Sequence, residues 1–344
     1  MDYKSSGVDI DAGHETVRRI KGLARGTFTS GVLSEIGSFG GLFRLEPGRF
    51  SDPVLVASAD GVGTKLKVAF MANRHDTVGE DLVNHCVNDI LVQGARPLFF
   101  LDYLATGRLS PAVAEQVVVG IARGCRANGC ALLGGETAEM PGFYAEGEYD
   151  LAGFIVGAVD RAHLVDGSTL RPGDVLIGLP SSGLHTNGYS LARQVVFDRL
   201  GLTVDSLVPE LGETLGDALL RVHVSYLPAV GPALEQPGLV RALAHITGGG
   251  ITDNLPRVLP AGCQALIDKG AWEVPPLFRF LGDAGQVPAD DMYRSFNMGI
   301  GLIVGCRADD ADRLLRGLGK VEPPGPRVIG EIVPGDRAVR YRSS

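Results

Sequence analysis

The chain has 344 residues, a formal net charge of −8 and a hydrophobic content of 45%. This length exceeds what one hydrophobic core usually serves, so we expect two domains. The acidic balance, without a basic block, argues against a nucleic-acid partner. Charged residues near the start argue against a signal peptide, and no apolar run approaches the ~20 residues of a membrane helix. Five cysteines without C-x-x-C spacing indicate a reducing compartment, so we expect a cytoplasmic protein with no membrane partner.

Glycine is enriched, with 48 residues, about twice the usual ~7%, which favours many tight loops. Residues 1–12 are expected to form a polar arm and residues 14–23 a short helix. Residues 37–43, Gly-Ser-Phe-Gly-Gly-Leu-Phe, form a glycine loop. Two interpretations of this loop stay open: a hairpin or linker, and a flexible lid that folds over a bound ligand.

Residues 60–65, Asp-Gly-Val-Gly-Thr-Lys, follow an apolar strand expected over residues 54–58. The two glycines allow a sharp turn and close backbone approach to a ligand, and the amides of such a turn can hold anionic oxygens. Lys65 could face a phosphate and Asp60 could hold Mg²⁺. The spacing matches neither the P-loop nor the dinucleotide fingerprint, which argues against an NAD-dependent oxidoreductase. The alternative is a plain tight turn with a solvated lysine.

A helix is expected over residues 79–93, because apolar side chains recur there at helical spacing. The opposite side carries Asp81, His85, Asn88 and Asp89, and it has no lysine. Solvated helix faces usually carry Lys and Glu, and short polar side chains are poor helix formers. We therefore interpret this face as a functional site, with packing against another polar surface as the alternative.

Strands expected at residues 97–103 and 130–133 flank a helix expected over residues 110–127. The helix begins with Ser-Pro, a capping residue followed by a first-turn proline. This order predicts a parallel crossover unit. Residues 134–142 are expected to leave the second strand as a loop, and Glu136 lies there beside glycines, where α/β proteins place their sites. The alternative is an ordinary surface loop.

A strand is expected at residues 149–160, and polar residues follow it. We place the domain boundary there, with domains at residues 1–168 and 169–344. The second half alternates strands expected at 175–179, 264–268 and 299–304 with helices expected at 189–200 and 309–318. The fold class is therefore α/β, or α+β in detail, with an amino-terminal mixed sheet and a carboxy-terminal sheet flanked by helices.

Two loops of the second half are rich in glycine and hydroxyl side chains, at residues 180–188 and 244–254. Each is expected to open a helix, where backbone N–H groups and the helix dipole favour an anion. His185 could be a core histidine, but its glycine and serine neighbours favour an exposed position. The second loop carries three successive glycines beside Thr247 and His245, which again suits close approach to an anion.

Taken together, the motifs resemble the phosphoribosylformylglycinamidine cyclo-ligase family, also called aminoimidazole ribonucleotide synthetases, of purine biosynthesis. The matching stretches are residues 7–13, 60–67, 87–90, 93–95, 98–103, 134–142, 181–190, 245–250 and 296–299. Formylglycinamidine ribonucleotide synthetase, selenophosphate synthetase and thiamine-monophosphate kinase share the architecture, but residues 134–142 and 185–190 point to the cyclo-ligase. Thr186 stands where many members have serine, and Asp253 where glutamate is common.

The resemblance implies a ligase reaction, in which formylglycinamidine ribonucleotide and ATP give aminoimidazole ribonucleotide, ADP and phosphate. Phosphoryl transfer would activate the formyl oxygen, and the amidine nitrogen would then close the ring. The alternative is a non-catalytic nucleotide-binding member of the same fold. Such a member would be expected to have lost Asp60, Lys65, Asp89 or His185, and all four are present.

The resemblance also implies the site residues and a homodimer formed by the amino-terminal sheets. The residues implied in ATP binding are Lys21, Gly40, Gly41, Asp60, Gly61, Gly63, Thr64, Asn88, Asp89, Gly135 and Glu136. The Mg²⁺ ligands implied are Asp60, Asp89 and Glu136. The residues implied on the ribonucleotide side are Ser181, Ser182, Asn187, Thr247, Gly248 and Gly249. The catalytic candidates are His185, Lys65 and His245, with His185 as the first acid/base candidate and His245 as the reserve.

Overall fold

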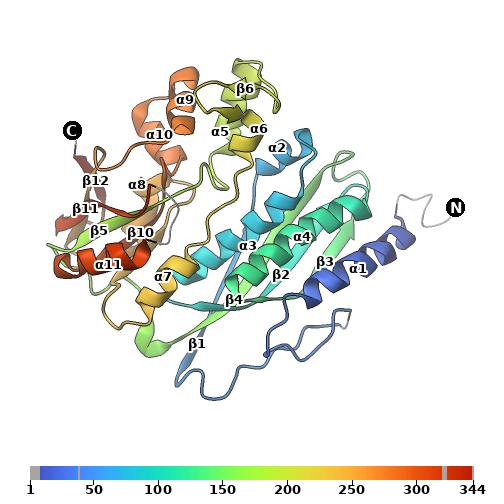
Figure 1. The fold of residues 1–344 in the computed structure, drawn as a ribbon, viewed down its shortest axis with the longest axis horizontal. Coiled ribbons are helices and arrows are strands. Elements are labelled where there is room, and N and C mark those ends of the chain that lie inside the picture. The colour runs from blue at the N-terminus through green and yellow to red at the C-terminus, as the bar shows by residue number, and fades with distance from the viewer. Residues whose placement is uncertain (1–7, 38, 320–323, 343–344) are drawn as a thin grey trace. The chain divides into compact units, whose positions relative to one another are not determined.

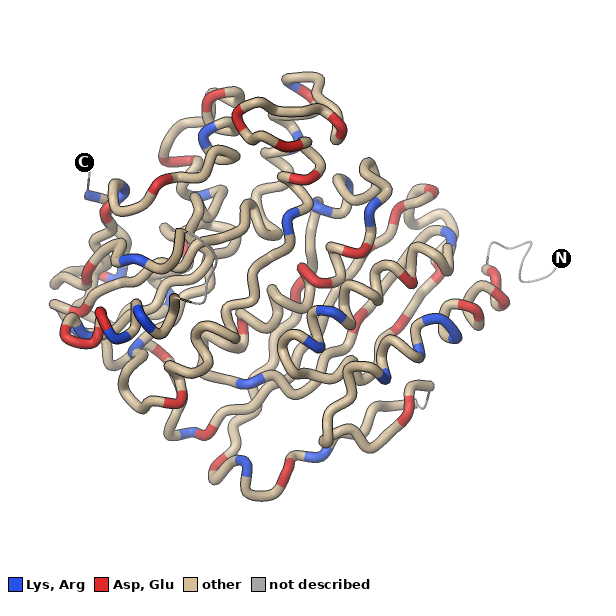
Figure 2. The backbone as a smooth tube through the Cα atoms, in the orientation of Figure 1, with Lys and Arg blue, Asp and Glu red and all other residues tan. Residues whose placement is uncertain are grey.

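The computed structural model describes residues 8–37, 39–319 and 324–342. The chain forms two compact units, which we call the amino-terminal unit (Met1–Ile90 with Ala95–Arg161) and the carboxy-terminal unit (Leu91–Gly94 with Ala162–Ser344). Among the described residues, none of the helices has the length and apolar character needed to span a membrane. Figure 2 shows that acidic and basic residues are interspersed in both units.

The amino-terminal unit contains a four-stranded sheet in the order β1-β4-β2-β3. Its strands are β1 (Pro53–Gly61), β2 (Arg96–Thr106), β3 (Ala131–Glu139) and β4 (Tyr149–Asp160). Strands β2 and β3 are parallel and are connected by helix α4 (Pro111–Asn128), whereas β4 runs antiparallel to both of its neighbours. The predicted crossover unit and mixed sheet are thereby confirmed.

Helices cover one face of this sheet, where α1 (Ile10–Arg25), α3 (Asp76–Leu91) and α4 lie side by side (Figure 1). The short helix α2 (Lys65–Met71) follows β1. Along β4 the buried side chains alternate with more exposed ones, so that Leu151 and Ile155 face the helices while Phe154 does not. This alternation follows from the two-residue period of a strand, and it leaves Leu55 and Phe154 exposed on the second face of the sheet, where Phe43 covers Phe99 of β2.

Several of the elements expected from the sequence have other bounds in the structure. Helix α1 begins at Ile10, because Asp9 caps it by accepting hydrogen bonds from the second and third residues that follow. Residues 134–139 are part of β3 and not a loop, because β2 pairs with them as far as Thr106 and Glu139. The expected helix at 189–200 divides into α5 (Tyr189–Arg193) and a π-helical turn (Gln194–Arg199). Residues 1–7 of the expected arm lie outside the described part of the chain.

The carboxy-terminal unit contains a six-stranded sheet in the order β12-β9-β11-β5-β10-β8. Its strands are β5 (Val175–Pro180), β8 (Ala242–His245), β9 (Cys263–Asp268), β10 (Ile300–Cys306), β11 (Arg327–Pro334) and β12 (Val339–Arg342). Its further helices are α6 (Leu215–Leu219), α7 (Leu227–Leu234), α8 (Gly250–Asn254), α9 (Pro276–Gly285), α10 (Ala289–Ser295) and α11 (Ala311–Leu318), and β6 (Leu207–Val208) pairs with β7 (Glu213–Thr214). Every residue of β10 is buried, which places this strand at the centre of the core.

Candidate active site

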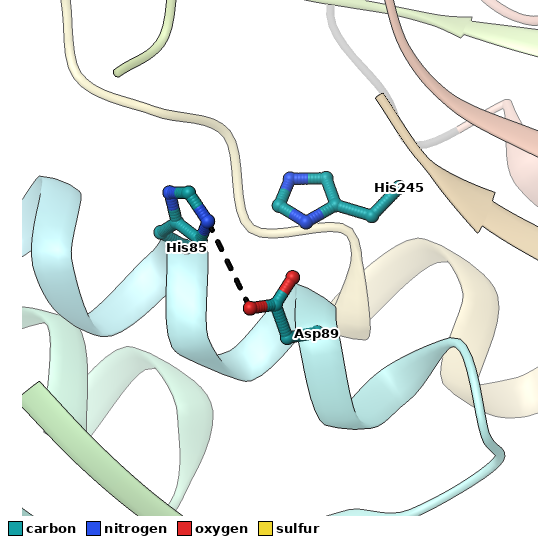
Figure 3. Close-up of side chains that lie close together, drawn as sticks. All are labelled: His85, Asp89 and His245. Carbon is teal, nitrogen blue, oxygen red and sulfur yellow. Dashed lines mark ion pairs between the residues drawn. The ribbon is translucent and has the colours of Figure 1, made fainter. Parts of the chain in front are cut away.

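The end of β1 and one side of α3 bring together the two aspartates expected to bind metal. A carboxylate oxygen of Asp60 lies 2.9 Å from Nε2 of His85, and a carboxylate oxygen of Asp89 accepts a hydrogen bond from Ser58 at 3.0 Å. His85 and Asp89 occupy successive turns of α3 and form an ion pair at 3.8 Å (Figure 3). The side chains of Asp60 and Asp89 are 44% and 24% exposed. We call Ser58, Asp60, His85 and Asp89 the β1–α3 cluster.

The β1–α3 cluster attracts positive charge. Burial of His85 opposes its protonated form, but the hydrogen bond that His85 donates to Asp60 and the charges of Asp89, Asp60 and Asp81 together raise the pKa of this histidine. The His85 ring therefore faces carboxylates that remain partly open to solvent. Two carboxylates and a hydroxyl group are hard oxygen donors, the kind that Mg²⁺ prefers.

Lys65 is fully buried at the start of α2, where its Nζ lies 2.8 Å from a carboxylate oxygen of Asp81. Burial lowers the pKa of Lys65, and the negative charge of Asp81 opposes this shift. The solvated lysine that was the alternative interpretation is therefore wrong. Its expected contact with a phosphate stays a prediction, since in this structure the ammonium group contacts α3 and not solvent.

The polar side of α3 is a buried surface and not a solvated helix face. Asp81, His85 and Asn88 are all inaccessible or nearly so. Asp81 contacts Lys65 at the start of α2, and His85 contacts Asp60 near the end of β1. The polar residues that the sequence singled out on this helix thus hold the Asp-Gly-Val-Gly-Thr-Lys segment in place.

A second candidate region is a groove of about 610 Å³ beside β3. It is bounded by α1, by residues 35–37 and 39–41 and by residues 132–137 of β3, and the expected ATP ligands Gly40, Gly41, Gly135 and Glu136 line it. Lys21 follows the lining residue Ile20 on α1 but does not itself line the groove.

Asp102, which was not among the site residues predicted from the sequence, also lines this groove. Burial raises the pKa of Asp102 to about 7, and the nearby charge of Glu136 acts in the same direction. Gly135 makes room for this carboxyl group, because a Cβ atom on Gly135 would lie 2.2 Å from Oδ1 of Asp102. The available signal was an acidic residue inside the otherwise apolar strand 97–103.

The groove and the β1–α3 cluster lie at opposite edges of the four-stranded sheet. Asp60 is paired with Gly153, Gly153 with Asp102, and Asp102 with Gly135. With about 4.8 Å between neighbouring strands, this row places β1 and β3 about 14 Å apart. A single chain therefore does not bring Glu136 to the carboxylates of Asp60 and Asp89, with which the sequence analysis had grouped it.

In the carboxy-terminal unit, three histidine rings contact one another in the interior. The ring centroids of His185 and His223 are stacked 4.0 Å apart, and Nε2 of His223 lies 3.0 Å from Nε2 of His245. All three residues are buried, so the expectation of an exposed His185 is wrong. His185 also has a φ of 61°, in the left-handed region that few residues with a side chain adopt. The sequence had indicated His185 and His245 but not His223.

The two expected ribonucleotide-binding loops are adjacent in this unit. A Cβ atom on Gly248 would lie 3.3 Å from Oδ1 of Asn187, which shows how closely the loops approach. Gly250, with a φ of 60°, would place a Cβ atom 2.0 Å from the carbonyl oxygen of Tyr293. A side chain at this position would force the loop out of place.

The hydroxyl groups of these loops form hydrogen bonds within the protein and thereby stabilise the loop conformations. Oγ of Ser181 donates to Oδ1 of Asn297 at 2.9 Å, and Oγ1 of Thr247 donates to Oδ1 of Asn254 at 3.2 Å. Ser182 donates its backbone N–H to Nε2 of His185 at 3.3 Å. Both loops are therefore held in fixed conformations whose backbone amides could meet an anion.

We expect His185→Ala to destabilise the protein. The change removes a buried ring that stacks on His223 and accepts a backbone hydrogen bond, and buried groups that lose a partner cost about 1–3 kcal/mol. Urea denaturation measures the loss in the free energy of unfolding. The control is His163→Ala, at an exposed histidine, which should stay within ~0.5 kcal/mol of the parent. Equal stability of the two variants would contradict this account of His185.

Comparisons with known proteins agree with this architecture. The amino-terminal domain model of AIR synthase related proteins matches residues 44–159, and the carboxy-terminal domain model matches residues 171–342. Solved structures with the same fold include thiamine-monophosphate kinase from Stenotrophomonas maltophilia, with a TM-score of 0.68, 20% identity and 95% coverage of both chains. The hydrogenase maturation protein HypE in complex with ATP has a TM-score of 0.69 and 17% identity, covering 96% of this chain and 90% of that one.

Closer relatives are found among curated proteins. Phosphoribosylformylglycinamidine cyclo-ligase of Trichlorobacter lovleyi is 55% identical and covers 92% of both chains. The protein of the same name from Syntrophotalea carbinolica is 53% identical and covers 96% of this chain and 94% of its own. Identity at this level along nearly the whole length is sufficient to assign the family of this chain. The chain belongs to the phosphoribosylformylglycinamidine cyclo-ligase family of the AIR synthase related proteins.

Proposed function

We propose that this chain is a cytoplasmic ligase that closes formylglycinamidine ribonucleotide to 5-aminoimidazole ribonucleotide, with release of ADP and phosphate from ATP. The observation that carries the proposal is the 55% identity, over 92% of both chains, to a protein named phosphoribosylformylglycinamidine cyclo-ligase. In this proposal, residues 1–168 bind ATP and form the dimer, and residues 169–344 bind the ribonucleotide.

The chemistry explains why an enzyme of this kind needs fixed loops and charges. A formamide carbonyl is a poor electrophile, and its oxygen is a poor leaving group. Transfer of the terminal phosphoryl group of ATP to that oxygen turns it into phosphate. The amidine nitrogen then forms the new C–N bond as phosphate leaves with the electrons of the C–O bond, and the nitrogen gives up a proton. Positioning and electrostatics supply most of the catalysis in reactions of this type.

The β1–α3 cluster is proposed to hold Mg²⁺ through Asp60 and Asp89. These carboxylates are partly exposed, one of them accepts a hydrogen bond from the Ser58 hydroxyl, and their negative charges raise the pKa of His85. When bound, Mg²⁺ would neutralise charge on the phosphates. Thr64, Asn88 and the glycines of the 60–65 segment are proposed to contact the same phosphates.

The β3 groove is proposed to hold another part of the nucleotide. Its volume of about 610 Å³ is within the usual range for pockets that bind small molecules. Gly40, Gly41 and Gly135 line it, and its apolar side chains could cover a base. Glu136 would then contact the nucleotide bound in this groove. Lys21 on α1 lies beside the groove. The solved HypE complex with ATP shows that a protein of this fold can bind this nucleotide.

A homodimer is proposed because large apolar side chains of β1 and β4 are exposed on one face of the amino-terminal sheet. Leu55 is 61% exposed and Phe154 45% exposed, and both point to this face. A two-fold axis along the strands would also place β1 of one sheet opposite β3 of its partner. The cluster and the groove, about 14 Å apart in one chain, would thereby complete each other across the interface.

We expect Leu55→Asp to weaken or abolish the dimer. Burying a carboxylate in an apolar interface costs several kcal/mol, since no partner compensates its charge. Sedimentation at micromolar concentration measures the change. The control is Leu207→Asp, at a leucine of the carboxy-terminal unit that is 69% exposed, which should leave the dimer intact. A parent chain that sediments as an active monomer would rule out the interface.

The function is tested by incubating the purified protein with formylglycinamidine ribonucleotide, ATP and Mg²⁺. One aminoimidazole ribonucleotide and one ADP should form for each substrate consumed. The alternative function, a non-catalytic nucleotide-binding member, predicts ATP binding by calorimetry without any product. The intact β1–α3 cluster favours the catalytic protein.

A further inference from the structure

The three histidines of the carboxy-terminal unit come from separate segments. His185 lies in the loop after β5, His223 in the segment between α6 and α7, and His245 at the end of β8. Their rings form a chain, because His223 stacks on His185 on one side and hydrogen-bonds to His245 on the other. His185 and His245, the outer members of this chain of rings, were predicted from the sequence as site residues. His223, the middle member, was not.

The surroundings of His185 fix its tautomer. Its Nε2 accepts the backbone N–H of Ser182 at 3.3 Å and that of Val224 at 3.5 Å. A backbone N–H can only donate, so Nε2 of His185 carries a lone pair, and in the neutral ring the proton sits on Nδ1. If Nε2 were protonated, its N–H would point toward two backbone N–H groups, and these three donors would repel one another. This arrangement disfavours His185 as the group that takes up a proton at Nε2.

The contact between His223 and His245 couples the tautomers of these two rings. Both atoms in the 3.0 Å contact are Nε2 nitrogens, so one must donate and the other must accept. If His245 donates, its own Nδ1 carries a lone pair, and if His223 donates, Nδ1 of His245 carries the proton. The far nitrogen of His223 lies 3.4 Å from the hydroxyl of Thr186, which can serve either tautomer.

We propose that His223 is a positioning residue that fixes the ring orientation of His245 and couples the tautomer of His245 to its own, and that His245 is the residue that would act as the acid/base group. The inference rests on the proposed function, since an acid/base group is needed there to accept the proton of the attacking amidine nitrogen. It assigns a role to a residue outside both anion-binding loops. It also moves the acid/base role from His185 to His245.

Three substitutions of His223 separate the contributions of its ring and its two nitrogens. His223→Phe keeps the ring and the stacking on His185 but removes both nitrogens. His223→Gln places an amide group near the position of Nε2, facing His245, and His223→Asn places one near Nδ1, facing Thr186. Because Asn and Gln carry the same functional group, they form a matched pair that differs in which contact is kept.

We expect His223→Phe and His223→Asn to lower kcat by about 10–100-fold, as is typical for residues that orient a functional histidine. KM for the ribonucleotide should change by less than about threefold, because uniform binding is not affected. His223→Gln should keep a kcat much closer to that of the parent protein than the other two variants do. Wild-type kcat in His223→Phe, or equal losses in the Gln and Asn variants, would overturn the proposal.

A spectroscopic measurement tests the same inference without turnover. The chain has seven histidines, so ring nitrogen resonances of ¹⁵N-histidine-labelled protein can be assigned by substitution, for example with His245→Gln. In His223→Phe the His245 nitrogens should shift toward a tautomer mixture, while those of His185 stay in place. Unchanged His245 resonances would overturn the proposal. If the parent protein forms no product, the proposed function fails, whereas these resonances still report the coupling.

Discussion

Asp60→Asn should lower turnover by about 10²-fold or more, on the order of several kcal/mol of transition-state stabilisation. The substitution keeps the shape of the side chain and its contact with His85, but it removes one of the two negative charges proposed to hold Mg²⁺. Because Asp60 is partly exposed, stability should change little. Steady-state kinetics at saturating ATP and Mg²⁺ measures the effect, and Asp89→Asn should behave in the same way.

The control for this prediction is Asp52→Asn. Asp52 lies just before β1 and forms an exposed ion pair with Arg161 at 2.8 Å, far along the strand from the cluster. This variant should keep full activity, since exposed pairs contribute little. Activity of Asp60→Asn within about twofold of the parent, under conditions where Mg²⁺ is saturating, would remove Asp60 from the metal site.

Lys65→Met should destabilise the protein by about 3–5 kcal/mol, the usual cost of removing one partner of a buried ion pair. Lys65 and Asp81 are both fully buried, so the substitution leaves a carboxylate without its ammonium partner in the interior. Denaturant unfolding of the purified variant measures the loss. Since many domains have only 5–15 kcal/mol in total, low yield of folded protein is part of the expected result.

Two further variants make the Lys65 result specific. Lys67→Met removes the neighbouring lysine of α2, whose ion pair with Glu148 is partly exposed, and should cost less than about 1 kcal/mol. The double variant Lys65→Met with Asp81→Leu replaces the pair by apolar groups and should recover much of the lost stability. If Lys65→Met is as stable as Lys67→Met, the buried pair does not stabilise the fold.

The sequence predicted best those elements whose signals are local. Helix α4 has Ser110 at the N-cap position, a first-turn proline and Gly129 in the left-handed region at its end, and its predicted and observed bounds nearly coincide. Strand β4 was predicted with its observed bounds, because its apolar run is long and ends at a polar segment. Such signals depend on a few neighbouring residues, so one sequence is enough to detect them.

What the sequence did not predict depends on partners that are distant along the chain. A solvated Lys65 was one interpretation of the sequence, but in the structure Lys65 is buried and forms an ion pair with Asp81, 16 residues further along the chain. The loop around His185 is rich in Gly and Ser, yet His223, 38 residues later, stacks on its ring and buries it. The extension of β3 likewise required β2 as its neighbour. Local composition describes such residues poorly because tertiary contacts decide their burial.

The row that runs from Asp60 through Gly153 and Asp102 to Gly135 has a consequence for how the protein would respond to its own abundance. Because the two proposed halves of the nucleotide site stand at opposite edges of one sheet, each nucleotide would be held by two chains. Nucleotide binding and self-association then reinforce each other by mass action. In that case dilution would lower nucleotide affinity, excess nucleotide would protect the dimer, and specific activity would rise with protein concentration until every chain is paired.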